Sequence, residues 1–157
     1  MNQPPDLYVP DLNPAEIPGP SRDVYAQMGR DNIYRMLEDF YRALESSTIR
    51  GMFPKDLARA SRKSAAFFVQ LLGGPQEYSE RFGPPRMRAR HLPFRITQQA
   101  RDEWLACFER VLDHAGADYG FPEQHLPGFR QFLRDFSRWM VNTAEQAEPS
   151  GAQPGGG

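Results

Sequence analysis

The sequence predicts an all-α protein, and three observations lead to this prediction. Apolar residues recur every three or four positions in four segments, the spacing that places side chains on one face of a helix. No segment has the Val-, Ile- and Thr-rich alternation that is typical of a strand. The 157 residues suffice for one domain, whose ordered part can bury roughly two thirds of its surface.

The two ends of the chain are predicted to lie outside this domain. Residues 1–21 are expected to form a flexible arm without regular elements, because six prolines among the first 20 residues remove amide donors. Residues 144–157 are expected to form a disordered tail, since "AEPSGAQPGGG" offers nothing to bury. The folded domain is therefore placed at residues 22–143.

The first two helices are predicted in the first half of the domain. One begins at Asp31, whose carboxylate is available as an N-cap. The next begins near Pro54 and continues to Leu72, where the glycines and proline of "GGP" at 73–75 stop it. The apolar stripe of the first is Ile33, Leu37, Phe40 and Leu44.

Two more helices are predicted in the second half. Thr97 is the expected N-cap of the third, which "HAGADYG" at 114–120 breaks. Cys107, the only cysteine, lies on its apolar face, which favours a small buried hydrophobe over a reactive thiol. The fourth helix is expected from about Pro122 to Asn142.

Residues 73–96 are predicted to form a loop of 24 residues that contains four prolines and three glycines. A loop of this length in a compact domain is usually functional or disordered. Ordering by a bound group is the functional interpretation, and the loop carries His91.

Composition excludes several classes of function. The formal net charge of −1 argues against a nucleic-acid partner. No apolar run is long enough to span a membrane, and the N-terminus has no secretory signal, so a cytoplasmic location is expected.

His91 does not belong to a conventional metal motif, because His114 and His125 are distant and no paired Cys or His spacing is present. Haem, however, needs only one protein ligand to its iron. The helices supply aromatic side chains for a flat slot, and Lys63 or Arg90 could hold a propionate, as could Arg86 and Arg88. The plain alternative, an aromatic core beside a solvated arginine face, stays open.

The stretch "RMRARHLPFRITQQARDEWLACF" at 86–108 closely resembles the proximal segment of group II truncated haemoglobins. Further similarity lies in "DFYRAL", "MFPKDL" and "FFVQLLGGPQEYSE", so the resemblance covers about residues 22–143. It implies a globin-like, two-over-two helical sandwich, with residues 22–143 as a truncated globin domain between the two arms.

The resemblance implies a site that binds haem b through its iron. His91 is then the axial ligand, and Tyr41 and Trp104 are the distal donors. Their O–H and N–H groups would be unsatisfied in an apolar core, and a bound dioxygen molecule accepts hydrogen bonds from both. The other residues placed at the cofactor are Phe53 against the porphyrin, Ala60 at a small distal entrance, Lys63 at a propionate and Phe67 on the wall.

Two departures from the family pattern limit this assignment. Ser64 stands where leucine or glutamine is more common; it adds a third distal hydroxyl, recruits a water or bonds back to the Ala60 carbonyl. The segment "QMGRD" at 27–31 has one glycine where the family often has a pair, which concerns the first helix and its turn.

The leading functional hypothesis is therefore an oxygen-binding globin that also takes other diatomic gases. A peroxidase or nitric-oxide dioxygenase at the same site is the enzymatic alternative, and it needs an external electron-donor reductase. A haem-free helical module that docks an acidic partner through residues 86–95 is the third hypothesis. A homodimer is compatible with each.

Overall fold

The computed structural model describes residues 7–144, and the regular elements in this part of the chain are helices, apart from one isolated bridge between Leu7 and Thr143. The long helices are α2 (Arg30–Glu45), α3 (Leu57–Leu71), α6 (Gln98–Leu112) and α8 (Leu126–Met140). The short ones are η1 (Pro14–Glu16), α1 (Val24–Met28), η2 (Arg50–Met52), α4 (Glu77–Phe82), α5 (Met87–His91), α7 (Ala115–Tyr119) and η3 (Glu123–His125).

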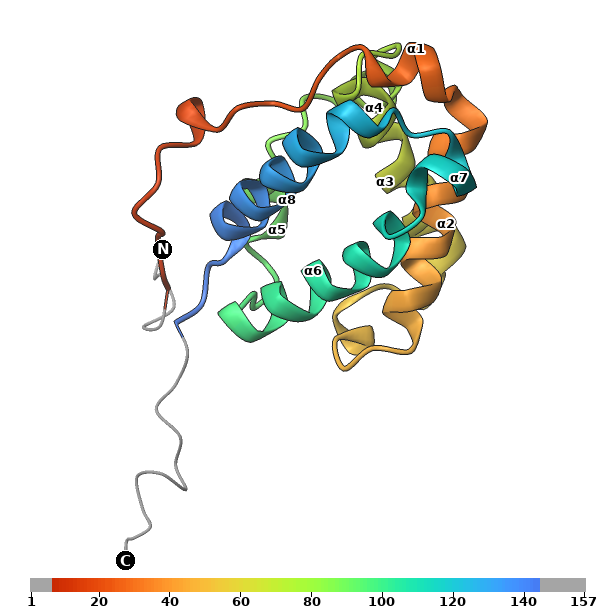
Figure 1. Ribbon diagram of the computed structural model, residues 1–157. Helices are drawn as coiled ribbons and strands as arrows, with labels where there is room; N and C mark the ends of the chain where they lie inside the picture. Colours follow the sequence, from red (N-terminus) through yellow and green to blue (C-terminus); the bar gives the residue numbers. More distant parts are fainter. Residues whose placement is uncertain (1–6, 145–157) are drawn as a thin grey trace, which may run out of the picture.

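The four long helices form two packed pairs. Helix α2 lies against α3, α6 lies against α8, and α2 also contacts α6, so that one pair covers the other (Figure 1). This arrangement is the predicted all-α, two-over-two sandwich. No helix among residues 7–144 is both long and apolar enough to cross a membrane.

Aromatic side chains fill the space between the two pairs. The Phe40 and Phe108 rings stack with their centroids 4.0 Å apart, and Phe68 and Phe129 pack around Phe108. Cys107 is fully buried beside them, as expected for a small hydrophobe, and burial raises the pKa of its thiol. The core thus joins all four long helices.

The helix starts agree only in part with the predictions. Thr97 caps α6 by accepting a hydrogen bond from the Ala100 amide at 3.2 Å. The prediction that Asp31 caps the first long helix was wrong. Helix α2 starts one residue earlier, after Gly29, whose φ of 83° suits glycine. Asp31 instead lies in the first turn, where its charge favours the positive end of the helix dipole.

The predicted fourth helix was too long, and the predicted break before it contains structure. Helix α8 begins at Leu126, with a proline in its first turn that lacks an amide to satisfy, and ends at Met140. The turn η3 precedes it. Helix α7 lies inside the predicted break, and the left-handed Gly120 ends it. Tyr119 of α7 is buried, so this short helix closes the core.

Residues 73–96, predicted to be a loop, contain the helices α4 and α5. Side-chain pairs attach α4 to its neighbours. The Gln70 amide donates to the Ser79 hydroxyl at 2.8 Å and accepts from the Ser79 amide at 3.0 Å. Local periodicity did not reveal these helices because each has only a turn or two, and contacts to distant residues hold them.

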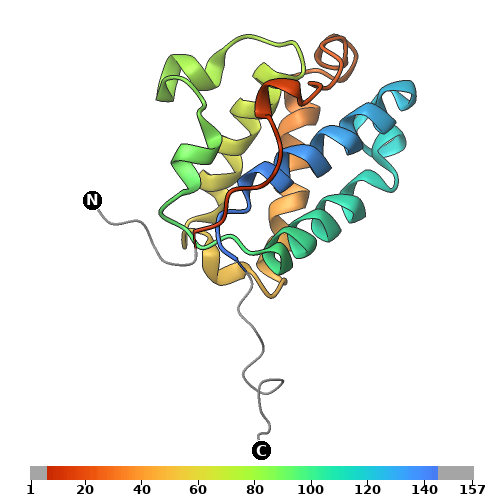
Figure 2. The same cartoon turned by 90° about the vertical axis from the view of Figure 1, so that its left-hand side faces the viewer.

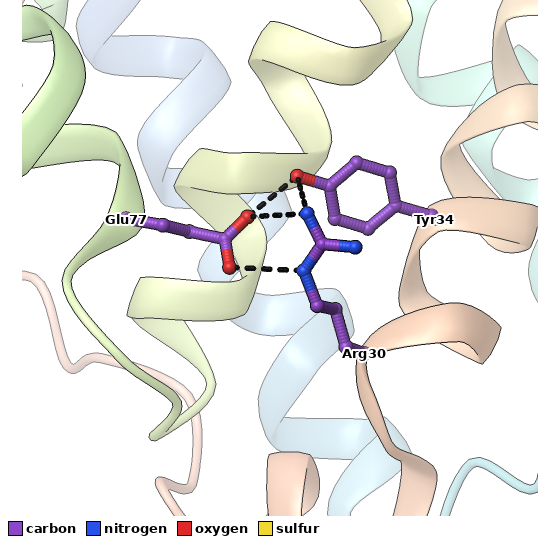
Figure 3. Close-up of polar contacts among 3 residues, drawn as sticks. All are labelled: Arg30, Tyr34 and Glu77. Carbon is purple, nitrogen blue, oxygen red and sulfur yellow. Dashed lines mark hydrogen bonds and ion pairs between the residues drawn. The ribbon is translucent and has the colours of Figure 1, made fainter.

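A three-residue cluster joins the start of α2 to the start of α4. Tyr34 donates to a Glu77 carboxylate oxygen at 2.5 Å, and the Arg30 guanidinium donates to both oxygens of Glu77 (Figure 3). The hydrogen bond with Glu77 raises the pKa of Arg30, so the pair stays charged. Figure 3 shows the three side chains converging from two helices that are far apart in the sequence.

The described part of the N-terminal arm lies along the domain rather than away from it (Figure 2). The Tyr8 amide donates to the Asn142 carbonyl at 2.9 Å, and Arg138 donates to the Asp11 carbonyl at 3.0 Å. The short 3-10 turn η1 is a regular element in an arm that was predicted to have none. Residues 1–6 and the predicted tail from 145 onward lie outside the described residues.

Candidate functional site

His91 is the last residue of α5, and its ring is held from within that helix. Its Nδ1 lies 2.6 Å from the Met87 carbonyl oxygen. A carbonyl oxygen only accepts, so Nδ1 carries the proton and donates. In the neutral ring the lone pair is then on Nε2, the arrangement that a metal-binding imidazole adopts when its other nitrogen bonds to a carbonyl.

The surroundings of His91 favour its neutral form. Burial lowers the pKa of His91, and the positive charge of Lys63 lowers it further, while the hydrogen bond with Met87 acts in the opposite direction. Lys63 lies on α3 and is close enough for its charge to act on the ring. At neutral pH the imidazole is therefore unprotonated at Nε2 and able to bind a metal ion.

Tyr41 lies on α2 and contacts residues of two other segments. Its ring meets the Phe53 ring edge-on with the centroids 6.0 Å apart, and Phe53 directly follows η2. Burial raises the pKa of Tyr41, and a hydrogen bond with Ser64 of α3 opposes this. Tyr41 is thus a neutral phenol with a proton to donate. The structure brings Tyr41, Phe53 and Ser64 together as predicted neighbours.

Trp104 of α6 contacts aromatic side chains of both α2 and α8. It contacts Phe40 at 5.5 Å and Phe136 at 6.5 Å between ring centroids. Phe136 in turn stacks on Phe67, 5.9 Å away. Sequence reasoning missed Phe136 as a site residue, because its spacing on α8 is the same as that of ordinary core positions.

A cleft of about 450 Å³ lies between residues 51–54, around the end of η2, and residues 93–95, which follow α5. Its volume lies in the range of small-molecule pockets. Phe53 lines it from the side of Tyr41, and Phe94, whose ring lies 6.3 Å from that of His91, lines it from the side of α5. Leu92 and Phe94 are 49% and 47% exposed, an unusual state for apolar residues beside an imidazole.

The basic residues divide into two kinds. Arg90 donates to the carbonyls of Phe82, Pro84 and Pro85 at 2.6–2.8 Å, so it orders the turn between α4 and α5. Lys63 is exposed and lies over the Phe82 ring at 4.8 Å. Ala60, the remaining predicted site residue, is half-buried on α3, one turn before Ser64.

Asn142, which sequence reasoning did not consider, holds the segment after α5. Its amide nitrogen donates to the carbonyls of His91 at 3.1 Å and Phe94 at 3.0 Å, and its amide oxygen accepts from the Ile96 amide. Asn142 is 3% exposed. No local pattern marks such a residue, because its partners lie far back in the chain.

The fold agrees with comparisons to known proteins. The family model described as bacterial-like globin matches residues 23–141. The chain belongs to the bacterial-like globin family. A curated relative, the group 2 truncated haemoglobin YjbI of Bacillus subtilis, is 36% identical over 127 residues, which cover 80% of this chain and 93% of the relative. The resemblance to group II truncated haemoglobins is therefore confirmed.

Solved structures place this globin in the same group. The structure of phosphate-bound Hell's gate globin IV has a TM-score of 0.75 and 34% identity, covering 95% of this chain and 89% of that one. The group II truncated haemoglobin of Bacillus anthracis has a TM-score of 0.72 and 32% identity, covering 81% and 95%. Residues 7–20 lie outside the span of the family model.

Globins bind haem with iron, so haem is the cofactor of this globin, and its ligands are diatomic gases. The donor set fits the group. His91 offers one nitrogen lone pair, aromatic side chains border the cleft, and Lys63 provides a positive charge near His91. Family membership leaves no support for the haem-free interaction module.

Proposed function

We propose that this globin binds dioxygen at a haem iron held by His91, with Tyr41 and Trp104 as hydrogen-bond donors on the opposite face. The observation that carries the proposal is one cleft lined by Phe53 and by Phe94. The Phe53 ring meets the neutral phenol of Tyr41, and the Phe94 ring lies beside the His91 imidazole, whose lone pair is on Nε2. When bound, haem would supply the iron at which a diatomic gas binds.

The distal residues act as donors in this proposal. Tyr41 keeps its proton because burial raises its pKa, and the half-buried indole of Trp104 can only donate. Two hydrogen bonds of about 1 to 1.5 kcal/mol each slow release of the gas by roughly 30- to 150-fold. Such retention favours storage, sensing or chemistry over rapid delivery. Ser64 bonds to Tyr41 and orients its hydroxyl.

We also propose that Lys63, rather than Arg90, pairs with a haem propionate. The Arg90 guanidinium is already bonded to three carbonyls that shape the turn before α5, whereas the exposed Lys63 lies near His91 and over Phe82. Phe53, Ala60 and Phe67 remain the proposed walls around the cofactor. The assignments of these residues rest on their positions in the fold.

A spectrum tests the central assignment. The purified globin is expected to be red, with a strong haem absorption band, and to take up added hemin in equimolar amount. His91→Ala is expected to lose the band or to retain hemin weakly, because the only proposed axial donor is gone. The matched control His114→Ala changes an exposed histidine at the start of α7 and should bind hemin like the wild type. A His91→Ala protein with an unchanged spectrum would contradict the assignment.

Enzymatic turnover at the same site stays a prediction. Peroxidase or nitric-oxide dioxygenase activity needs electrons from an external reductase. The reductase partner, a homodimer and a cytoplasmic location likewise stay predictions. Peroxide-dependent oxidation of a dye, compared between the wild type and Tyr41→Phe, separates catalysis from storage.

A further inference from the structure

The segment that carries His91 is not held by α5 alone. Helix α5 has only five residues, too few to be stable by its own hydrogen bonds. Leu92 and Phe94, which follow it, are exposed, so they contribute little packing. The position of the His91 backbone must therefore be set by contacts from elsewhere in the fold.

Those contacts come from the few residues after α8. The side-chain amide of Asn142 donates both of its hydrogens, one to the His91 carbonyl and one to the Phe94 carbonyl. Its oxygen accepts from the Ile96 amide at 2.9 Å and from the Thr143 hydroxyl at 2.8 Å. The backbone of Asn142 adds a bond from its amide to the Ile96 carbonyl. Three of the four hydrogen bonds that this buried side-chain amide makes are therefore to residues 91–96.

We infer that Asn142 is a positioning residue for the axial histidine. It holds the backbone carbonyl of the residue whose ring is the proposed iron ligand. It therefore sets the distance and the angle at which the imidazole approaches the iron. The inference rests on the proposed role of His91. It adds a residue that lies just beyond the end of the family match at 141 and acts through the backbone of His91.

Arg88 of α5 supports this inference because it also bonds α5 to the end of α8. Its guanidinium donates to the carbonyls of Trp139 at 2.6 Å and Val141 at 2.7 Å, the residues just before Asn142. Arg88 lies one helical turn before His91 on α5. The end of α8 and helix α5 are thus bonded in both directions, which keeps Asn142 in register with its carbonyls.

The test uses Asn142→Asp, which has the same shape but no N–H to donate. A carboxylate oxygen would then face the carbonyls of His91 and Phe94, while the bond from the Ile96 amide can remain. We expect hemin to leave this variant about tenfold faster than the wild type. The iron–histidine stretching band in the resonance Raman spectrum of the ferrous protein is expected to shift and broaden.

A readout that does not depend on haem accompanies these measurements. Hydrogen exchange of the protein as purified should be faster in residues 91–96 of Asn142→Asp, by roughly tenfold. If the aspartate variant does not fold, Asn142→Ser is the second variant. Its hydroxyl donates one hydrogen bond where the amide donates two, so a smaller change in the same direction is expected.

Ser137→Ala is the matched control for a general loss of stability. Ser137 is buried on α8 and accepts a hydrogen bond from Arg101 at 3.0 Å, but it has no bond to residues 91–96. This variant should melt at a lower temperature with an unchanged iron–histidine band. An unchanged band in Asn142→Asp, with hemin loss no faster than in Ser137→Ala, overturns the inference.

The outcomes also separate this inference from the proposed function. If His91→Ala binds hemin as the wild type does, the proposed function fails. The positioning of an iron ligand by Asn142 then fails with it, whatever hydrogen exchange shows. If the wild type binds hemin through His91 and Asn142→Asp leaves the band unchanged, only the role of Asn142 fails.

Discussion

At the scale of single residues, the site depends on two neutral groups. His91 is neutral because burial and the charge of Lys63 lower its pKa, and Tyr41 is neutral because burial raises its pKa. One therefore offers a lone pair and the other a proton. These are the protonation states that suit the proposed roles of an iron ligand and a hydrogen-bond donor to a bound gas.

Tyr41→Phe tests the distal donor. The ring and its contact with Phe53 are kept, and only the hydroxyl is lost, so oxygen release is expected to be about tenfold faster. Stopped-flow measurement of the oxygen dissociation rate checks this. Tyr34→Phe is the matched control on the same helix, because its hydroxyl bonds to Glu77 instead. An oxygen dissociation rate that is the same in Tyr41→Phe and the wild type would contradict the role of Tyr41 as a distal hydrogen-bond donor.

At the scale of elements, short helices are attached to α2 by side-chain hydrogen bonds. Helix α4 is joined through the Glu77 cluster (Figure 3), and α7 through Tyr119, which donates to Asp39 at 2.5 Å. Both helices are too short to be stable alone. Helix α2 thus positions Tyr41 and also organises the segments on either side of the site.

The bond between α7 and α2 predicts how stability changes at alkaline pH. Burial and Asp39 raise the pKa of Tyr119 above its ordinary value of 10.0. Above about pH 10 the unfolded chain releases this proton while the folded protein still holds it, so the free energy of unfolding falls as pH rises. In Tyr119→Phe this contribution is absent. The free energy of unfolding should therefore fall less steeply between about pH 9 and 11, roughly the range in which tyrosine titrates.

Urea unfolding at a series of pH values measures both proteins. The variant is expected to be less stable near neutrality, because Asp39 loses a hydrogen bond, and to approach the wild type at high pH. Tyr34 and Tyr78, whose pKa values are also raised, keep a residual slope in both proteins. Identical slopes would contradict the assignment to Tyr119.

At the scale of the whole molecule, the two ends of the described chain meet at α5. Arg88 donates to the Trp139 and Val141 carbonyls and, at 2.8 Å, to the Tyr8 carbonyl of the N-terminal arm. Its guanidinium also lies over the Trp139 ring, 4.9 Å from the centroid. One side chain therefore joins the arm, α8 and the helix that carries His91.

Arg88→Ala is expected to lower the free energy of unfolding by about 2 to 3 kcal/mol, since three carbonyls lose a charged donor. Denaturant unfolding of the haem-loaded protein at a fixed hemin concentration measures the change. Arg86→Ala is the control: Arg86 is exposed at the start of the same helix, and its replacement should have little effect. Equal losses in the two variants would argue against a joining role for Arg88.

Part of this globin could be predicted because the relevant information is local in the sequence. Periodic apolar residues predicted the four long helices, and Thr97 was identified as a cap from its position before one of them. The stretch around His91 resembled a family segment, which led to haem. The prediction of Asp31 as a helix cap was wrong because Gly29, with its positive φ, precedes a helix that starts one residue earlier.

The sequence by itself determined the helical class, the long helices and the segment that carries the proposed axial histidine, since each depends on neighbours within a few turns of chain. Only the tertiary structure decided the rest. Asn142 holds the His91 backbone, Arg90 serves a turn rather than the cleft, and α4 and α5 are helical inside a predicted loop. Their hydrogen-bond partners lie on other elements, and which carbonyl meets which donor is settled only when the two helix pairs pack together.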